Sequence, residues 1–137
     1  MRKVTKFVSL TGREKTLFAE ALILETAVGL LLKIIPFRLI PRLFASHHSA
    51  ALSLQPEVPG LIKKAIRRAS WVSPWRNKCL VSSLAGRWMM NRRKIKTQIS
   101  LGVTKEGAGK IIAHAWLRSG DYEIVPRNGE YVELHCF

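Results

Sequence analysis

The chain has 137 residues, of which 47% are hydrophobic, enough for one domain and too few for two well-formed cores. Its formal net charge of +14 predicts an anionic partner: nucleic acid, an acidic membrane surface, or an acidic peptide or protein. Two cysteines, Cys79 and Cys136, are too few for a disulfide-stabilised secreted scaffold. The first residues are basic but include no apolar run ending in a cleavage site, so we expect a cytoplasmic protein.

Residues 13–45 have the apolar periodicity of a helix. Pro36 and Pro41 interrupt this pattern, which predicts a break near Ile35 and a short second helix over residues 38–44. The apolar residues that recur at helical spacing are Leu17, Ala21, Leu24, Val28, Leu31 and Ile35.

The most hydrophobic part of this helix is too short to cross a membrane. Only about 15 residues separate Ala21 from Pro36, and charged residues interrupt them, whereas a span needs about 20. The pattern favours a helix packed on its own domain or on a partner. Attachment to a membrane surface is the alternative, supported by Lys33, Arg38 and Arg42.

Two further helices are predicted after a linker. Residues 46–60 are rich in serine, proline and glycine, as linkers are. Residues 61–69, LIKKAIRRA, predict a short amphipathic helix with a basic face. Another apolar stripe begins near Cys79 and ends in the cationic run 92–94, which is favourable at the carbonyl end of a helix.

The remainder of the chain is predicted to form strands separated by turns. Alternating, β-branched and aromatic residues are typical of strands at 98–103, 110–117, 122–125 and 131–137. Helices followed by an antiparallel sheet indicate an α+β fold.

Two residues in this pattern have the chemistry of a thiol enzyme. Cys79 lies at a predicted helix start beside Arg76 and Lys78, where amides and cations stabilise a thiolate. His114 lies in a predicted strand, where alternation places it on one face with Ile112 and Trp116. A helix-borne cysteine with a strand-borne histidine suits papain-like acyl transfer. A small buried cysteine and a structural histidine are the competing interpretations.

The string CLVSSLAGRWMMNRRKI, followed by LGV and AHAWL, resembles the leader peptidase of lasso-peptide biosynthesis, a transglutaminase-like cysteine protease. The resemblance covers residues 61–137, and the N-terminal helices are similar to the standalone peptidase of the split form of that family. It implies a papain/transglutaminase-like core in residues 61–137, with a nucleophile-bearing helix on an antiparallel sheet. Residues 1–60 would then be a helical region and linker for docking to a partner or membrane.

The resemblance also implies roles and partners. Cys79 would be the nucleophile and His114 the base that remove the leader from a ribosomally made precursor, through a thioester and without a metal or cofactor. A separate leader-recognition protein would deliver the substrate, and a lasso cyclase would use the released α-amine.

The sequence departs from the family at the third catalytic position. The family places an acid on the strand after the histidine, where this chain has Pro126. A two-residue turn at Ser119–Gly120 would pair His114 with Val125. Asn128 is the nearest substitute, because an amide oxygen can also fix the imidazole tautomer. A backbone carbonyl or a water is the favoured alternative.

Two other functions remain open from the residues alone. A basic nucleic-acid-binding module would use residues 63–68 and 92–94 as phosphate contacts. It is disfavoured because the sequence has no zinc-ligand spacing, no RNA-recognition aromatic motif and no convincing helix-turn-helix. An amide-forming transglutaminase would use the same thiol and imidazole and differs from a protease in the acceptor, amine instead of water.

Overall fold

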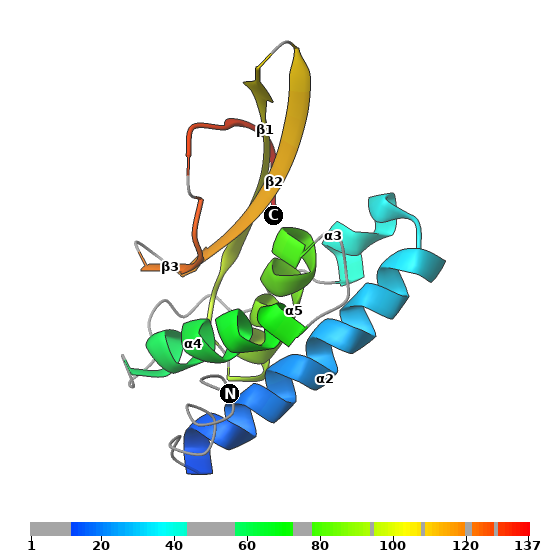
Figure 1. The fold of residues 1–137 in the computed structure, drawn as a ribbon. Helices are drawn as coiled ribbons and strands as arrows, with labels where there is room; N and C mark the ends of the chain where they lie inside the picture. Colours follow the sequence, from blue (N-terminus) through cyan, green and yellow to red (C-terminus); the bar gives the residue numbers. More distant parts are fainter. Residues whose placement is uncertain are drawn as a thin grey trace.

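A computed structural model of the chain describes residues 12–43, 57–72, 78–93, 95–107, 109–119, 122–127 and 129–137. Helices precede strands, which confirms the predicted α+β order (Figure 1). The helices are α2 (Gly12–Ile34), the 3-10 helix η1 (Phe37–Leu39), α3 (Ile40–Leu43), α4 (Glu57–Val72) and α5 (Lys78–Arg92). The strands are β1 (Gln98–Glu106), β2 (Lys110–Ser119), β3 (Tyr122–Val125) and β4 (Val132–Cys136).

The helix boundaries follow the proline pattern with one correction. α2 ends at Ile34 and η1 follows Pro36, as the two prolines predicted. α4 begins at Glu57, inside the predicted linker, and runs past Ala69 to Val72. Pro59 does not prevent this, because proline is tolerated in the first turn of a helix. Residues 44–56 of the predicted linker lie outside the described part of the chain.

The four strands form one antiparallel sheet in the order β3-β2-β1-β4. β1 and β2 pair along their whole length, with Gly102 opposite His114. The predicted β2–β3 register is wrong, since Leu117 and not His114 pairs with Val125. Ser119 pairs with Tyr122, so residues 120–121 and not 119–120 connect the strands, and a bulge follows Leu117.

The core lies between α2 and the sheet, where α4 and α5 pack on α2 on one side and on the strands on the other. Figure 1 shows the β1–β2 hairpin extending beyond this layer of helices. α2 contributes fully buried residues to the same core as α4 and α5, so the described residues on both sides of residue 60 share one core. The buried members include Leu17, Ala21, Leu24, Val28, Ile62, Ile66, Leu84, Met89, Ile99, Leu117 and Ile124.

A glycine sets the close approach of α5 to β2. A Cβ atom added at Gly86 would lie 2.7 Å from Cδ2 of Leu117, well inside van der Waals contact. The helix can therefore rest on the strand because residue 86 has no side chain. This contact fixes the distance between the helix that begins at Lys78 and the strand that carries His114.

A buried arginine joins α5 to the sheet. Arg87 is fully buried and donates from Nε to Thr97 Oγ1 at 3.1 Å and from Nη2 to the Thr97 carbonyl at 2.9 Å. It also donates to the carbonyl of Phe137, whose ring lies 5.1 Å from the guanidinium. Burial lowers the pKa of Arg87 to about 10, and Cys136 opposes this shift. The guanidinium therefore fastens α5 to the start of β1 and to the end of the chain.

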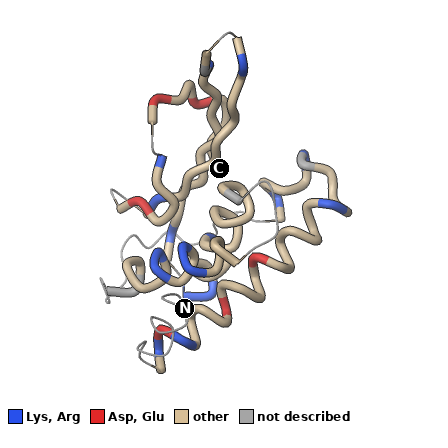
Figure 2. The backbone as a smooth tube through the Cα atoms, viewed as in Figure 1, with Lys and Arg blue, Asp and Glu red and all other residues tan. Residues whose placement is uncertain are grey.

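Basic residues are spread along the helices, and acidic residues are fewer (Figure 2). One ion-pair cluster joins α2 to the end of α5, where Glu20 lies 2.8 Å from Arg92 and 2.7 Å from Arg93. The hydrogen bond from Arg93 holds the pKa of Glu20 below its ordinary value. Across the described residues, no helix combines the length and the hydrophobicity that crossing a membrane requires.

Candidate active site

Cys79 occupies the first turn of α5 and is a partly buried free thiol. The amides of a first helical turn have no partner within the helix, and they stabilise negative charge on a nearby sulfur. The loop of residues 73–77, with Arg76, lies outside the described residues, and so does the side chain of Lys78. The contribution of those two cations therefore stays a prediction.

The turn that follows Cys79 is held by a buried polar contact to α2. Ser82 and Ser83 lie one turn after the cysteine, and both are buried. The hydroxyl of Ser82 donates to Oε1 of Glu25 at 3.1 Å, and Glu25 is itself buried in α2. This hydrogen bond limits the rotation and translation of the first turns of α5.

His114 lies in the middle of β2, where its ring is half-buried. Its Nε2 atom is 3.0 Å from the carbonyl oxygen of Pro126. A carbonyl oxygen can only accept, so in this contact Nε2 holds the hydrogen and the neutral ring keeps Nδ1 free as a base. Pro126 lies at the position where the resemblance implies an acid, and its main-chain oxygen provides the acceptor that its side chain lacks. Asn128, the other candidate, lies outside the described residues.

Aromatic rings enclose the imidazole. The Trp116 ring centroid lies 6.1 Å and the Tyr131 centroid 5.0 Å from that of His114, and the two aromatic centroids are 6.0 Å apart. Arg127 lies 5.1 Å from the Trp116 centroid and donates to the Tyr131 carbonyl at 2.5 Å. These contacts restrict rotation of the imidazole and hold the segment that includes Pro126.

A glycine directly opposite His114 makes room for this cluster. A Cβ atom at Gly102 would lie 2.9 Å from Cη2 of Trp116 and 2.9 Å from the carbonyl oxygen of Val132. The Trp116 ring therefore packs directly on the main chain of β1 at Gly102, between β2 and β4. This gives a physical reason for the glycine of the LGV string.

Sequence reasoning correctly placed Trp116 on the same side of β2 as His114, but it missed Tyr131 and Arg127. Strand alternation is a local pattern, and it identified Trp116. The other two residues reach the histidine through strand pairing and a loop, which no local pattern specifies. The available signal for Tyr131 was its place as an aromatic residue at the start of the last predicted strand.

The two proposed catalytic residues lie on neighbouring elements. α5 carries Cys79, β2 carries His114, and the two elements pack together at Gly86 and Leu117. In the part of the chain that the structure describes, no hydrogen bond connects the Cys79 thiol with the His114 ring. Leu117, which faces α5, and His114 lie on alternate sides of the strand. The pairing of the thiol with the imidazole therefore stays a prediction.

Cys136 has a different environment. It is exposed on β4, where Nε2 of Gln98 donates to its sulfur. Among the described residues, no cluster of histidine, cysteine and carboxylate side chains is able to hold a metal ion.

A family model described as the transglutaminase-like superfamily matches residues 22–133. The matched region includes most of α2 and all of α4, α5, β1, β2 and β3. It therefore contains both Cys79 and His114. No curated protein and no solved structure matches the chain significantly.

Proposed function

The chain belongs to the transglutaminase-like superfamily, and we propose that it is a cysteine peptidase that removes the leader from a ribosomally made lasso-peptide precursor. The superfamily includes both cysteine peptidases and transglutaminases. The observation that best supports a catalytic His114 is its Nε2 contact with the Pro126 carbonyl, which leaves Nδ1 free. The resemblance of the helix, LGV and AHAWL strings to the lasso leader peptidase supports the substrate class.

The proposed reaction needs only groups of the protein, the substrate and water. Nδ1 of His114 takes the proton of the Cys79 thiol, and the sulfur attacks the scissile carbonyl. Backbone amides at the start of α5, that of Cys79 among them, stabilise the oxyanion. The protonated His114 gives its proton to the leaving amine as the C–N bond breaks and a thioester forms. Water, deprotonated by the same histidine, then hydrolyses the thioester and releases the leader with a free carboxylate.

A carbonyl in place of a carboxylate changes how the imidazolium is stabilised. The Pro126 oxygen orients the ring and accepts its hydrogen bond, but it supplies a dipole and no full negative charge. The faces of Trp116 and Tyr131 offset part of this loss, since aromatic rings attract a nearby cation. We therefore expect an enzyme with a correctly oriented base and slow intrinsic turnover.

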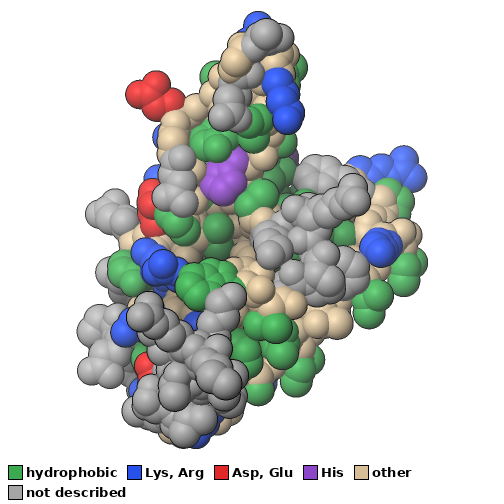
Figure 3. Space-filling model, in the orientation of Figure 1, with side chains coloured by type: hydrophobic (Ala, Val, Ile, Leu, Met, Phe, Trp, Pro, Cys, Tyr) green, Lys and Arg blue, Asp and Glu red, His purple; other side chains and the backbone are tan. Residues whose placement is uncertain are grey.

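The proposal includes protein partners. Exposed apolar side chains follow the outer side of α2 and continue into η1 and α3, at Ile23, Leu30, Ile34, Leu39 and Leu43. Figure 3 shows hydrophobic side chains open to solvent along the edge of the molecule formed by α2. We propose that these residues, the apolar edge, contact the separate leader-recognition protein, with the lasso cyclase acting on the product. The alternative is contact of the apolar edge with the cytoplasmic surface of a membrane, because the basic residues Lys33, Arg38 and Arg42 beside the edge would attract anionic lipids.

Cleavage of the precursor by a Cys79→Ala variant tests the function. Incubation of precursor, recognition protein and peptidase, followed by mass spectrometry, should show leader and core fragments with the wild type and none with Cys79→Ala. Cys136→Ala is the matched control and should keep most of the activity, because Cys136 is exposed on β4. Cleavage by Cys79→Ala at the wild-type rate would disprove the proposal. Addition of a primary amine separates the two enzyme classes, since a transglutaminase would give the amide product in place of the free acid.

A further inference from the structure

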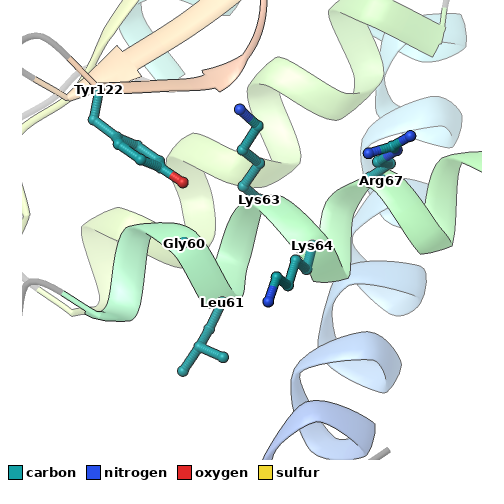
Figure 4. Close-up of a pocket in the computed structure, with 6 residues that line it drawn as sticks. All are labelled: Gly60, Leu61, Lys63, Lys64, Arg67 and Tyr122. Carbon is teal, nitrogen blue, oxygen red and sulfur yellow. The ribbon is translucent and has the colours of Figure 1, made fainter.

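A pocket of about 590 Å³ opens between α4 and β3. Its lining consists of Gly60, Leu61, Lys63, Lys64 and Arg67 from α4, and Tyr122 from β3 (Figure 4). None of the residues assigned to catalysis lines it. The pocket is therefore a second site whose chemistry has to be explained separately.

The pocket has a strongly positive lining. Lys63, Lys64 and Arg67 project from neighbouring turns of one helix, and no acidic side chain is among the described residues that line the pocket. None of these three cations has an ion pair within the described residues, whereas their neighbour Arg68 lies 3.9 Å from Glu14. A negatively charged ligand would thus meet three cations that are not already neutralised.

Tyr122 makes the site a pocket instead of a flat helix face. The Lys63 amine lies 5.5 Å from the centroid of the Tyr122 ring, and Figure 4 shows the tyrosine side chain pointing towards α4. The tyrosine hydroxyl comes within 3.5 Å of the position that a Cβ of Gly60 would occupy. The ring holds the lysine by a cation–π contact and supplies an apolar wall on the β3 side of the pocket.

We propose that this pocket binds an acidic peptide segment, with aspartate or glutamate carboxylates at the three cations and an apolar side chain against the Tyr122 ring. Residues 60–67 span about 12 Å of helix, a length that suits a few peptide residues. Nucleic-acid binding generally follows a longer row of phosphates, and the concave, partly apolar lining favours the peptide. The identity of that segment, as part of the precursor leader or of the recognition protein, rests on the proposed function.

A binding measurement on the full chain with Cys79→Ala tests the pocket independently of catalysis. The probe is a fluorescein-labelled peptide of alternating glutamate and serine, followed by fluorescence anisotropy. The Lys63→Glu/Arg67→Glu double variant should bind it at least ~10-fold more weakly, because two attractive charges become repulsive. The control is Lys105→Glu/Lys110→Glu, which makes the same change in net charge at exposed positions beside the β1–β2 turn. It should change the affinity by no more than about 2-fold.

Variants of the tyrosine distinguish a pocket from a charged surface. Tyr122→Ala removes the ring that holds Lys63 without altering charge and should weaken binding of the acidic probe, while Tyr122→Phe keeps the ring and should restore it. Circular dichroism checks that each variant is folded. If Lys63→Glu/Arg67→Glu does not fold, the neutral double variant Lys63→Gln/Arg67→Gln takes its place. This neutral double variant should also bind more weakly than the wild type, and unchanged affinity would contradict the proposal.

Three further results would overturn the proposal. If the pocket variant Lys63→Glu/Arg67→Glu and the control Lys105→Glu/Lys110→Glu lost the same affinity for the probe, net charge alone would explain the attraction. Equal binding of a glutamine–serine peptide would show that carboxylates are not recognised. If the chain bound single-stranded oligothymidylate more tightly than the acidic peptide, and Lys63→Glu/Arg67→Glu lost that binding, the site would be assigned to nucleic acid. A chain that binds the acidic probe but cleaves no precursor would contradict the proposed function and leave the pocket assignment standing.

Discussion

Nε2 of His114 lies 3.0 Å from the main-chain oxygen of Pro126, at the position where the resemblance predicts an acidic side chain. A proline cannot supply a carboxylate, but any residue supplies a carbonyl. The main-chain oxygen of Pro126 therefore keeps the hydrogen bond that orients the imidazole, although the proline side chain cannot supply an acid. The cost is a weaker electrostatic partner for the ring when it is protonated.

The first prediction concerns the tautomer of this histidine. In two-dimensional nitrogen-proton spectra, the neutral imidazole of His114 should carry its hydrogen on Nε2. His114→Ala should lower the rate of precursor cleavage at least ~10²-fold, in the range for loss of a general base. A comparable His135→Ala change should have little effect, because His135 is exposed on β4. A hydrogen on Nδ1, or a His114→Ala variant with wild-type activity, would contradict the assignment.

The second prediction concerns the glycine opposite His114. Gly102→Ala would place a methyl group 2.9 Å from both Trp116 and the Val132 carbonyl. We expect a loss of about 1–3 kcal/mol in the free energy of unfolding, measured with urea, as overpacking usually causes. Cleavage should also slow, because the displaced indole lies against the His114 ring.

Gly12→Ala is the matched control for this change, since no atom of the described residues lies within 4 Å of the added Cβ. It should leave stability and activity nearly unchanged. If Gly102→Ala were as stable and as active as this control, the proposed packing of Trp116 over residue 102 would be wrong.

The third prediction concerns pH and the ion-pair cluster between α2 and α5. The hydrogen bond from Arg93 lowers the folded-state pKa of Glu20 below the ordinary 4.5. The resulting stabilisation is fully present above pH 4.5 and is lost as the pH falls through the folded-state pKa. Glu20→Gln should therefore be less stable than the wild type at pH 7, and the difference should shrink as the pH falls below 4.5.

Urea unfolding at a series of pH values measures this difference. Glu133→Gln serves as the control, because Glu133 is an exposed carboxylate on β4. A stability gap for Glu20→Gln that stays constant below pH 4 would argue against an ionic origin.

The elements that local patterns specify were predictable, and those set by long-range geometry were not. Proline positions located the end of α2, and alternation located β2 with His114 and Trp116 on one side. The β2–β3 register was missed because it depends on which two residues form the turn and on a bulge after Leu117. The cationic face of residues 61–69 was visible in the sequence. Tyr122, which turns that face into a pocket, comes from a strand more than 50 residues later.

The last prediction concerns activation by the recognition protein. Slow intrinsic turnover and a small domain predict weak cleavage by the isolated chain. Addition of the leader-binding partner should raise the rate at least ~10-fold by increasing the effective concentration of the leader at the site. Ile34, which is 79% exposed on α2, lies in the proposed apolar edge. Ile34→Glu should abolish this gain and leave the basal rate unchanged, because a charge there disrupts apolar docking.

Ile111→Glu is the control for this variant, since Ile111 is similarly exposed, at 65%, on β2. It should keep the activation. The gain should also fall as salt rises from about 50 to 500 mM, because exposed charge pairs between the basic chain and an acidic leader or partner are screened over that range. Loss of vesicle binding by Ile34→Glu, with activation intact, would assign the edge to the membrane. Fast, salt-insensitive cleavage by the isolated chain would show that partner dependence and electrostatic docking are both wrong, even if Cys79 and His114 catalyse the reaction.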